Sequence, residues 1–414
     1  MNQPKIKPQT LKGFRDFLPV DMTVRNYVKN TLTSLFETCG FQPLETPALE
    51  YGSVLKGKYG SETDDKLGYF FKDNGDREVG LRYDLTVPTA KILAIYNNQL
   101  SLPFRRYQIQ PVWRAENTQK GRYREFIQCD IDIFGTDSPI ADAEIISIIY
   151  QGTQKFGFKD AVIKINSRQI LASILSQSGI ETNQNSVLQS LDKLDKIGED
   201  GVKNEIISKG LNTTQIDKLL NNIKIAQPDD KLSQILNSLN DFNIPKSAFV
   251  FDPSLVRGCD YYTSTIFEIQ VPQANGSIGG GGRYDNLIET LGGPSIPAVG
   301  FSFGFERLVD VIQDLQLVPK ENQNNIKILI ANLGTETQKE IINLTNQLRQ
   351  NNISSIIYPD NEKLGKQIKY ALSLGISYLA IIGTNEAKNN TITLKNLNTT
   401  EQQTVSLKEL VDML

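Results

Sequence analysis

Residues 104–134 read FRRYQIQPVWRAENTQKGRYREFIQCDIDIF, and this stretch decides the fold around which the rest is arranged. Strand-like segments over 107–113 and 125–134 flank a polar, turn-like segment, which predicts a hairpin. Six basic residues stand against Glu116 over 104–124, a net charge of +5 in an acidic chain. The six are Arg105, Arg106, Arg114, Lys120, Arg122 and Arg124. Since guanidinium groups suit phosphate or carboxylate, we expect the hairpin to hold an anion; a solvated basic hairpin is the alternative.

The second strand of this hairpin alternates between polar and apolar residues. Gln128, Asp130 and Asp132 fall on one face, because side chains of a strand alternate with a period of two. The opposite face carries Ile127, Cys129, Ile131 and Ile133. The pattern therefore predicts that the amide and the two carboxyl groups lie together.

The chain on either side of the hairpin mixes helical and extended patterns. Apolar residues at helical spacing predict a helix over 21–39, and the prolines in 41–49 predict an extended segment. Residues 172–246 have a helical pattern rich in Asn, Gln, Lys and Leu, which predicts an inserted helical subdomain. Further strands are expected over 81–87, 247–251, 261–271 and 298–303, with a helix over 306–317.

A polar linker over 318–325 precedes a regularly alternating C-terminal part. Strands and helices alternate there over 326–331, 337–350, 353–358, 363–374 and 378–382. This βαβαβ order predicts a small three-layer α/β domain with a largely parallel sheet.

The composition is that of a globular protein. The 414 residues are 39% hydrophobic and 22% charged, with a net charge of −3 that provides no global positive field for nucleic acid. No apolar run approaches the ~18 residues of a membrane span, and the N-terminus lacks the apolar core of a secretory signal. Three widely spaced cysteines match no zinc motif and fit free thiols. We therefore expect a cytoplasmic protein without a membrane partner.

The absence of histidine limits the chemistry most sharply. It excludes Ser/His/Asp and Cys/His nucleophilic machinery, histidine-bound metals and imidazole acid–base catalysis. The chemistry must use arginine, lysine, carboxylates, hydroxyls, amides or a bound ion.

Three further segments carry candidate site residues. The segment LVRGCDYYTSTIFE, 255–268, combines Arg257 with Tyr261 and Tyr262, which fits either a polar recognition pocket or a buried aromatic strand. The glycine run 279–282 would let a ligand approach the backbone, although it matches neither the Walker motif nor the dinucleotide fingerprint. In AVGFSFGFERL, 298–308, Arg307 near a helix N-terminus invites an anion; a surface arginine is the alternative.

The order of these segments resembles the class II aminoacyl-tRNA synthetases. GFQPLETPALE, VWRAENTQKGRYREF and GFSFGFERL resemble motifs 1, 2 and 3 of that class. LVRGCDYYTSTIFE, GGGGRYDNL, LRYDLTVP and KLGKQIKYA sharpen the resemblance to the histidyl-tRNA synthetase family, over nearly the whole chain. The resemblance implies an α+β catalytic domain over 1–325 with a central antiparallel sheet, the helical insertion 172–246, and an anticodon-binding domain over 326–414.

The resemblance implies a set of ATP-binding residues. Arg114 would grip the α-phosphate and the substrate carboxylate, and Glu116 would lie near the adenine. Arg122 and Arg307 would bind the triphosphate, with Mg²⁺ accompanying ATP. Arg257 would act beside the α-phosphate, so Arg257 and Arg114 are the expected catalytic residues.

It also implies a histidine-binding set. Asp84 and Thr86 would hold the amino group, and Asp132 with Tyr262 would bracket the imidazole. The whole expected set is Asp84, Thr86, Arg114, Gln128, Asp132, Arg257, Tyr261 and Tyr262.

Expected activity and partners follow from the same resemblance. The chain would be a histidine-tRNA ligase that acts on ATP, L-histidine and tRNA(His) and forms a homodimer. One alternative is the catalytically inactive, histidyl-synthetase-like regulatory subunit of ATP phosphoribosyltransferase, which typically lacks the RG-x-DYYT motif and the C-terminal domain. A stand-alone sensor of uncharged tRNA is a third possibility. Ala115 and Ile127 depart from the histidines common in bacterial relatives, and Cys259 and Ser264 from the commoner Leu and Gly, but the first two positions are not principal ligands.

Overall fold

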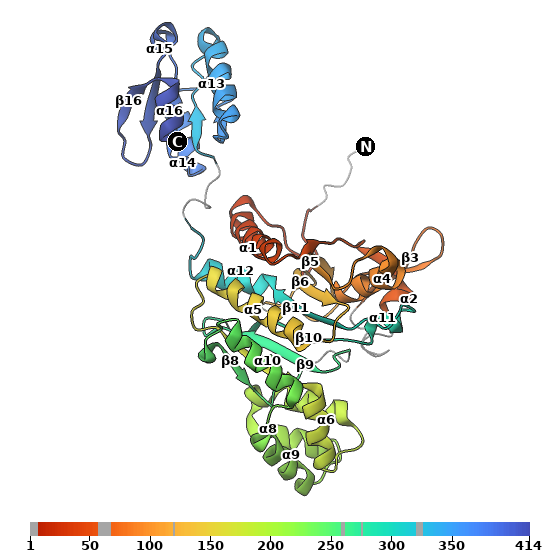
Figure 1. Ribbon diagram of the computed structural model, residues 1–414. Coiled ribbons are helices and arrows are strands. Elements are labelled where there is room, and N and C mark those ends of the chain that lie inside the picture. The colour runs from red at the N-terminus through yellow and green to blue at the C-terminus, as the bar shows by residue number, and fades with distance from the viewer. Residues whose placement is uncertain (1–6, 57–67, 119–120, 258–260, 275, 320–325) are drawn as a thin grey trace. The chain divides into compact units, whose positions relative to one another are not determined.

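The structure, a computed structural model, describes residues 7–56, 68–118, 121–257, 261–274, 276–319 and 326–414. Lys120 of the basic hairpin, and Gly258, Cys259 and Asp260 of the 255–268 segment, lie outside the described residues. The chain divides into two units, Met1–Leu317 and Val318–Leu414, and each is described by itself (Figure 1).

The first unit is built on an eight-stranded sheet in the order β1-β5-β6-β11-β10-β9-β7-β8. All neighbours are antiparallel except the two edge pairs, β1 with β5 and β7 with β8. The strands are β1 (Gln42–Pro43), β5 (Phe104–Trp113), β6 (Glu125–Phe134), β7 (Val162–Ser167), β8 (Phe249–Phe251), β9 (Thr265–Gln270), β10 (Ser277–Arg283) and β11 (Ala298–Gly304). The predicted α+β fold with a central antiparallel sheet and the predicted hairpin are confirmed, because β5 and β6 pair without a break from Phe104↔Phe134 to Trp113↔Glu125.

Helices α1 (Pro19–Thr38), α5 (Pro139–Lys155) and α12 (Phe305–Asp314) contact one another and the sheet (Figure 1). The predicted helix over 21–39 is α1, which begins with Pro19 and with Asp21 accepting a hydrogen bond from the Leu18 N–H at 3.1 Å. Its apolar stripe, Val28, Leu32, Leu35 and Phe36, is buried. Gly40, with φ of +79°, turns the chain after the helix.

A small antiparallel sheet lies next to the β5–β6 hairpin, which it meets through the hydrogen bond from the Trp113 N–H to the Arg82 carbonyl. Its elements are β2 (Leu49–Tyr51), β3 (Tyr69–Lys72) and β4 (Glu78–Leu81), with α2 (Gly52–Leu55), α4 (Thr86–Tyr96), η1 (Asn97–Gln99) and α11 (Leu287–Thr290) nearby. The predicted strand over 81–87 is wrong. The strand ends at Leu81 and a helix begins at Thr86, because Asp84 accepts a hydrogen bond from the Val87 N–H at 3.1 Å and so caps that helix.

The segment predicted to be a helical insertion is helical, with five helices between β7 and β8. They are α6 (Arg168–Gln177), α7 (Gln184–Leu191), α8 (Leu194–Ser208), α9 (Thr213–Ile225) and α10 (Asp230–Asp241), followed by η2 (Lys246–Ala248). Helix α10 packs on α5, so the end of the insertion lies against the first unit's helical layer (Figure 1).

The second unit is the predicted three-layer α/β domain. Its sheet has the order β13-β12-β14-β15-β16, with β13, β12 and β14 parallel and the last two strands antiparallel. The elements are β12 (Ile328–Ile330), η4 (Thr335–Thr337), α13 (Gln338–Gln350), β13 (Ser355–Ile357), α14 (Leu364–Ser373), β14 (Tyr378–Ile381), α15 (Thr384–Asn389), β15 (Ile392–Asn396), β16 (Gln402–Val405) and α16 (Leu407–Met413). Ile328 and Ile330 belong to the core formed with α13 and α16, and Leu329 to the core formed with α14, so both faces are covered. Across the described ranges, none of the helices has the length and apolar character needed to cross a membrane.

Candidate active site

A cavity of about 410 Å³ opens where the end of the β5–β6 hairpin meets β10, β11 and the start of α12. Its lining includes six residues singled out from the sequence, four of them arginines. The six are Arg114, Glu116, Arg122, Gln128, Arg257 and Arg307. Guanidinium groups from three separate segments of the chain therefore surround one space.

The hairpin positions Arg114 at the mouth of this cavity. The Arg114 N–H donates to the carbonyl of Arg124 at 2.8 Å, which continues the pairing beyond the last residues of β5 and β6. The side chain donates from Nε to the carbonyl of Tyr83 at 3.0 Å, and its Cζ lies 5.1 Å from the Phe126 ring centre. A backbone acceptor and an aromatic ring thus orient the guanidinium.

The structure divides the basic residues of the hairpin among different partners. Arg105 pairs with Glu144 at 2.7 Å, Arg106 is fully buried against Asp132 at 2.6 Å, and Arg124 Nε donates to the Glu116 carbonyl at 3.2 Å. Among the described basic residues of the segment, Arg114 and Arg122 line the cavity. The prediction that the hairpin holds an anion therefore rests on Arg114 and Arg122, because the described Arg105, Arg106 and Arg124 are directed to internal carboxylates and a carbonyl.

Arg307 enters the cavity from the first turn of α12. Its Nη1 donates to the carbonyl of Ser277 at 2.7 Å. Burial lowers the pKa of Arg307, and the positive charges of Arg122 and Arg257 lower it further against the opposing effect of Glu268. The three arginines are therefore within electrostatic range of one another, an arrangement that a polyanion would stabilise.

The glycine run predicted to allow close approach to the backbone forms strand β10, and Gly279 and Gly280 line the cavity. A Cβ at Gly280 would overlap the guanidinium of Arg257. The Arg257 guanidinium therefore fills the space that a side chain at position 280 would take.

Glu306, next to Arg307, also lines the cavity, is nearly fully buried and is held by two arginines. Nη1 and Nη2 of Arg25 donate to its carboxylate at 2.6 and 2.9 Å, Arg15 donates to the same group, and the Ile127 N–H donates at 3.2 Å. Burial alone would raise the pKa of Glu306, but the hydrogen bonds and charges of Arg25 and then the charge of Arg15 hold it below its usual value. This cluster joins α1, α12 and the start of β6, and so fixes the two elements that carry Arg307 and Gln128.

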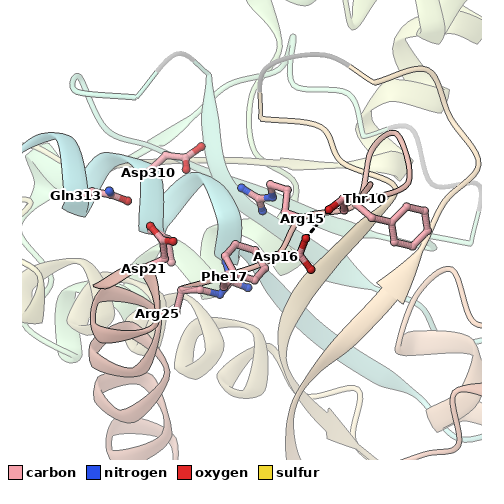
Figure 2. Close-up of a pocket in the computed structure, with 10 residues that line it drawn as sticks. Thr10, Arg15, Asp16, Phe17, Asp21, Arg25, Asp310 and Gln313 are labelled. Atoms are coloured by element: carbon pink, nitrogen blue, oxygen red, sulfur yellow. Dashed lines mark hydrogen bonds between the residues drawn. The ribbon is translucent and has the colours of Figure 1, made fainter. Parts of the chain in front are cut away.

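A second cavity of about 350 Å³ is lined in part by Arg15 and Arg25, the two arginines of this cluster (Figure 2). Figure 2 shows Asp21 and Arg25 of α1 and Asp310 and Gln313 of α12 around it, with Asp16 hydrogen-bonded to Thr10. Its lining includes none of the residues predicted to bind ATP or histidine.

An acidic and phenolic group adjoins the arginine-lined cavity along strand β6. Asp132 lies four residues beyond Gln128 on the same face, its Oδ2 lies 2.6 Å from Nη2 of Arg106, and its Oδ1 accepts a hydrogen bond from the Tyr284 hydroxyl. The Tyr261 ring lies 4.9 Å from the Tyr262 ring and 5.8 Å from the Tyr284 ring. Asp84 lies close enough to Asp132 for its charge to raise that carboxyl's pKa.

Two glycines separate Asp132 from Tyr262 across the sheet. Gly300 of β11 is the direct partner of Asp132, and Gly282 of β10 is the direct partner of Gly300. A Cβ at Gly300 would overlap Oδ1 of Asp132, and a Cβ at Gly282 would lie 2.9 Å from the Tyr262 ring. The row therefore keeps the carboxyl and the phenol on one face with only backbone between them.

Burial dominates the acid–base properties of this group. It raises the pKa of Asp132, against the opposing charge of Arg106, and it raises the pKa of Asp130 to about 7. Asp84 and Thr86 are buried at the capped start of α4. Arg106 pairs with Asp132 and lies 4.0 Å from Asp130, so one guanidinium lies beside two buried carboxyl groups.

Sequence reasoning missed three residues that shape the site: Arg106, Tyr284 and Glu268. Arg106 was counted only as part of a basic cluster, since its position opposite Asp132 depends on the β5–β6 register. Tyr284 and Glu268 were within quoted motifs but had no predicted partner, because Asp132 is 152 residues from Tyr284 and Arg257 is 11 residues from Glu268.

Comparison with known proteins gives consistent matches over nearly the whole chain. The family model described as Histidyl-tRNA synthetase matches residues 13–308, and the model described as Anticodon binding domain matches residues 327–414. The chain is 38% identical to a histidine–tRNA ligase of Cytophaga hutchinsonii and 39% identical to one of Bacteroides fragilis strain YCH46, in each case over 99% of both chains. It superposes on the crystal structure of histidyl-tRNA synthetase from Nostoc sp. PCC 7120 with a TM-score of 0.85 and 31% identity, covering 99% of this chain and 100% of that one.

Proposed function

The chain belongs to the histidyl-tRNA synthetase family, and from that premise we propose that it is a histidine–tRNA ligase. It activates L-histidine with ATP to histidyl-adenylate and transfers the histidyl group to the 3′ end of tRNA(His). The observation that carries the proposal is the meeting of Arg114, Arg257 and Arg307 around one cavity.

Activation places negative charge where these arginines lie. The carboxylate of histidine attacks the α-phosphorus of ATP in line, and pyrophosphate leaves. Arg114 and Arg257 stabilise the charge at the α-phosphate, and Arg122 and Arg307 hold the leaving pyrophosphate, with Mg²⁺ entering as part of the ATP substrate. Glu116 lines the same cavity, and we assign it to the adenine of ATP. The step needs no enzyme base, which is compatible with a chain that contains no histidine.

Selection of histidine depends on the neighbouring acidic and phenolic group. Asp132 and Tyr262 lie over Gly300 and Gly282, and we assign to them the imidazole, which donates to the carboxyl and accepts from a hydroxyl. Asp84 and Thr86 hold the amino group, while Gln128 and Tyr261 complete the histidine site. An amino acid without a ring N–H cannot donate to the Asp132 carboxyl, and sites built to hydrogen-bond a substrate N–H discriminate by roughly 10⁴-fold.

The second unit and the assembly complete the proposal. We assign residues 1–325 to the catalytic domain with the insertion 172–246, and residues 326–414 to an anticodon-binding domain that contacts tRNA(His). The match of the anticodon-binding model to 327–414 supports the second assignment. We further propose that the enzyme is a cytoplasmic homodimer.

Histidine-dependent exchange between ATP and labelled pyrophosphate tests the activation step. We expect exchange with L-histidine and a rate about 10⁴-fold lower with L-phenylalanine, whose ring has no N–H to donate to Asp132. Charging of tRNA(His) then tests the transfer step. A folded sample without histidine-dependent exchange would contradict the proposal.

The regulatory-subunit alternative is less well supported. The chain contains an anticodon-binding unit and places Arg257 in the arginine-lined cavity, both of which a ligase uses. A sample that lacks exchange but stimulates an ATP phosphoribosyltransferase would favour that alternative.

A further inference from the structure

An ion pair at the edge of the arginine-lined cavity fixes the position of Arg257. Its Nη1 donates to Oε2 of Glu268 at 2.8 Å, and the two side chains are 23% and 19% exposed. Glu268 lies within strand β9, and Arg257 precedes that strand. The arginine therefore folds back along the sheet to reach the carboxylate.

The sheet beneath the ion pair leaves space for the guanidinium. Gly280 of β10 is the direct cross-strand partner of Glu268, and a Cβ at Gly280 would overlap the Arg257 guanidinium. The guanidinium thus lies against the glycine backbone, next to the carboxylate that pairs with it. Backbone below and carboxylate beside it restrict its movement.

Glu268 itself is held in place. Its second oxygen, Oε1, accepts a hydrogen bond from Nε2 of Gln270 at 3.2 Å. Lys164, its cross-strand partner on β7, is paired with Asp252 at 3.0 Å. Lys164 therefore has a carboxylate partner in Asp252, while Oε2 of Glu268 pairs with Arg257.

The Glu268 carboxylate offsets part of the positive charge of the cavity. The four arginines that line the cavity repel one another before an anion arrives. The effects on the pKa of Arg307, where Arg257 lowers and Glu268 raises it, place Glu268 within range of both cations. Loss of that carboxylate would remove a hydrogen bond that opposes movement of Arg257 away from the other arginines.

We propose that Glu268 is a positioning residue that holds the Arg257 guanidinium over Gly280, ready for the charge that develops in the reaction. This inference rests on the proposed ligase activity for its effect on catalysis, but the positioning itself can be measured without turnover. The matched comparison is Glu268→Gln against Asp252→Asn. Each removes one carboxylate charge from adjacent ion pairs, and only the first removes the partner of Arg257.

Chemical labelling tests the positioning directly. We expect Glu268→Gln to raise the rate at which phenylglyoxal modifies Arg257 by roughly 3- to 10-fold, because a charge-assisted hydrogen bond is lost. Peptide mapping by mass spectrometry measures this rate, with the exposed Arg77 as reference. Asp252→Asn should leave Arg257 at the wild-type rate. An unchanged rate in Glu268→Gln would overturn the proposal, whether or not the protein is a ligase.

Kinetics test the catalytic consequence. We expect Glu268→Gln to lower kcat of histidine-dependent exchange by about 10- to 100-fold with little change in the KM for ATP, because displacement of a catalytic group by about 1 Å has costs of this order. Glu268→Asp should recover part of the loss. In an Arg257→Lys background the same substitution should have a much smaller effect, since the two residues act as one unit. Full additivity of the two substitutions, or equal losses in Glu268→Gln and Asp252→Asn, would show that Glu268 does not act through Arg257.

Wild-type behaviour separates the two hypotheses. Faster labelling of Arg257 in Glu268→Gln, together with no exchange in the wild type, would retain the positioning role and refute the ligase activity. Normal wild-type exchange with unchanged labelling of Arg257 in Glu268→Gln would retain the ligase activity and refute the positioning role.

Discussion

Removing Glu306 should destabilise the first unit, because it leaves the buried guanidinium of Arg25 without this carboxylate. Glu306 and Arg25 are 5% and 6% exposed, and two hydrogen bonds at 2.6 and 2.9 Å join them. Breaking a buried ion pair by removing one partner costs about 3–5 kcal/mol, because an uncompensated charge remains. We therefore expect Glu306→Ala to lower the free energy of unfolding of the first unit by that amount. With a urea m-value of about 3 kcal/mol/M, the unfolding midpoint falls by roughly 1–1.7 M.

Fluorescence of Trp113 is the assay. It is the only tryptophan in the chain and lies at the end of β5, so it reports unfolding of the first unit alone. Glu78→Gln is the control, since its ion pair with Lys56 is exposed and such pairs contribute at most about 1 kcal/mol. The double variant Arg25→Met/Glu306→Leu should be more stable than either corresponding single variant.

The same pair gives a pH dependence with a defined sign. The pKa of Glu306 is lower in the folded protein than the ordinary value of 4.5, so its contribution is fully present above that value and is lost as pH falls through the lower folded pKa. The difference in the free energy of unfolding between wild type and Glu306→Ala should therefore become smaller in acid. Equal midpoints for Glu306→Ala and Glu78→Gln at pH 7, or a difference that does not depend on pH, would refute this reasoning.

Three other variants test separate parts of the site. Arg257→Ala should reduce histidine-dependent exchange by about 10²–10³-fold with an unchanged Trp113 transition, because its proposed role is to stabilise charge; near-normal turnover would remove it from the mechanism. Gly300→Ala should abolish histidine binding measured by calorimetry and spare ATP binding, because its Cβ overlaps Oδ1 of Asp132; unchanged histidine affinity would count against the site. Burial raises the pKa of Asp130 from 3.8 to about 7, so the folded state retains a proton that the unfolded chain releases, and stability should fall as pH rises between those values. Asp130→Asn should remove up to ~4 kcal/mol of this pH-dependent decrease in the free energy of unfolding. Parallel curves of stability against pH for the variant and the wild type would contradict the prediction.

Local patterns predicted much of the fold. The alternation over 125–134 and the turn residues before it were enough to predict the hairpin, and helical spacing was enough to predict α1. These signals succeed because neighbouring residues of one element determine its own periodicity. The strand predicted over 81–87 failed for the complementary reason: a capping carboxyl, Asp84, turns an apolar run into the start of a helix.

Charge counting did not separate the arginines that line the cavity from those that lie elsewhere. Arg105, Arg106 and Arg124 counted equally with Arg114 in the sequence, but Arg114 lines the cavity, whereas the other three pair with Glu144, Asp132 and the Glu116 carbonyl. Whether an arginine faces a cavity or a buried carboxylate depends on strand register, which composition does not contain.

The chain by itself determined which chemistry is possible: arginines, carboxylates and phenols in a recognisable order, and no histidine. Only the tertiary structure decided which of these groups meet. Arg106 faces Asp132 because β5 and β6 pair in one register, and Arg257 lies against Glu268 because Gly280 on the next strand has no side chain. Both contacts depend on pairing between strands, and a sequence records the order of residues along a strand without the identity of the residues beside it.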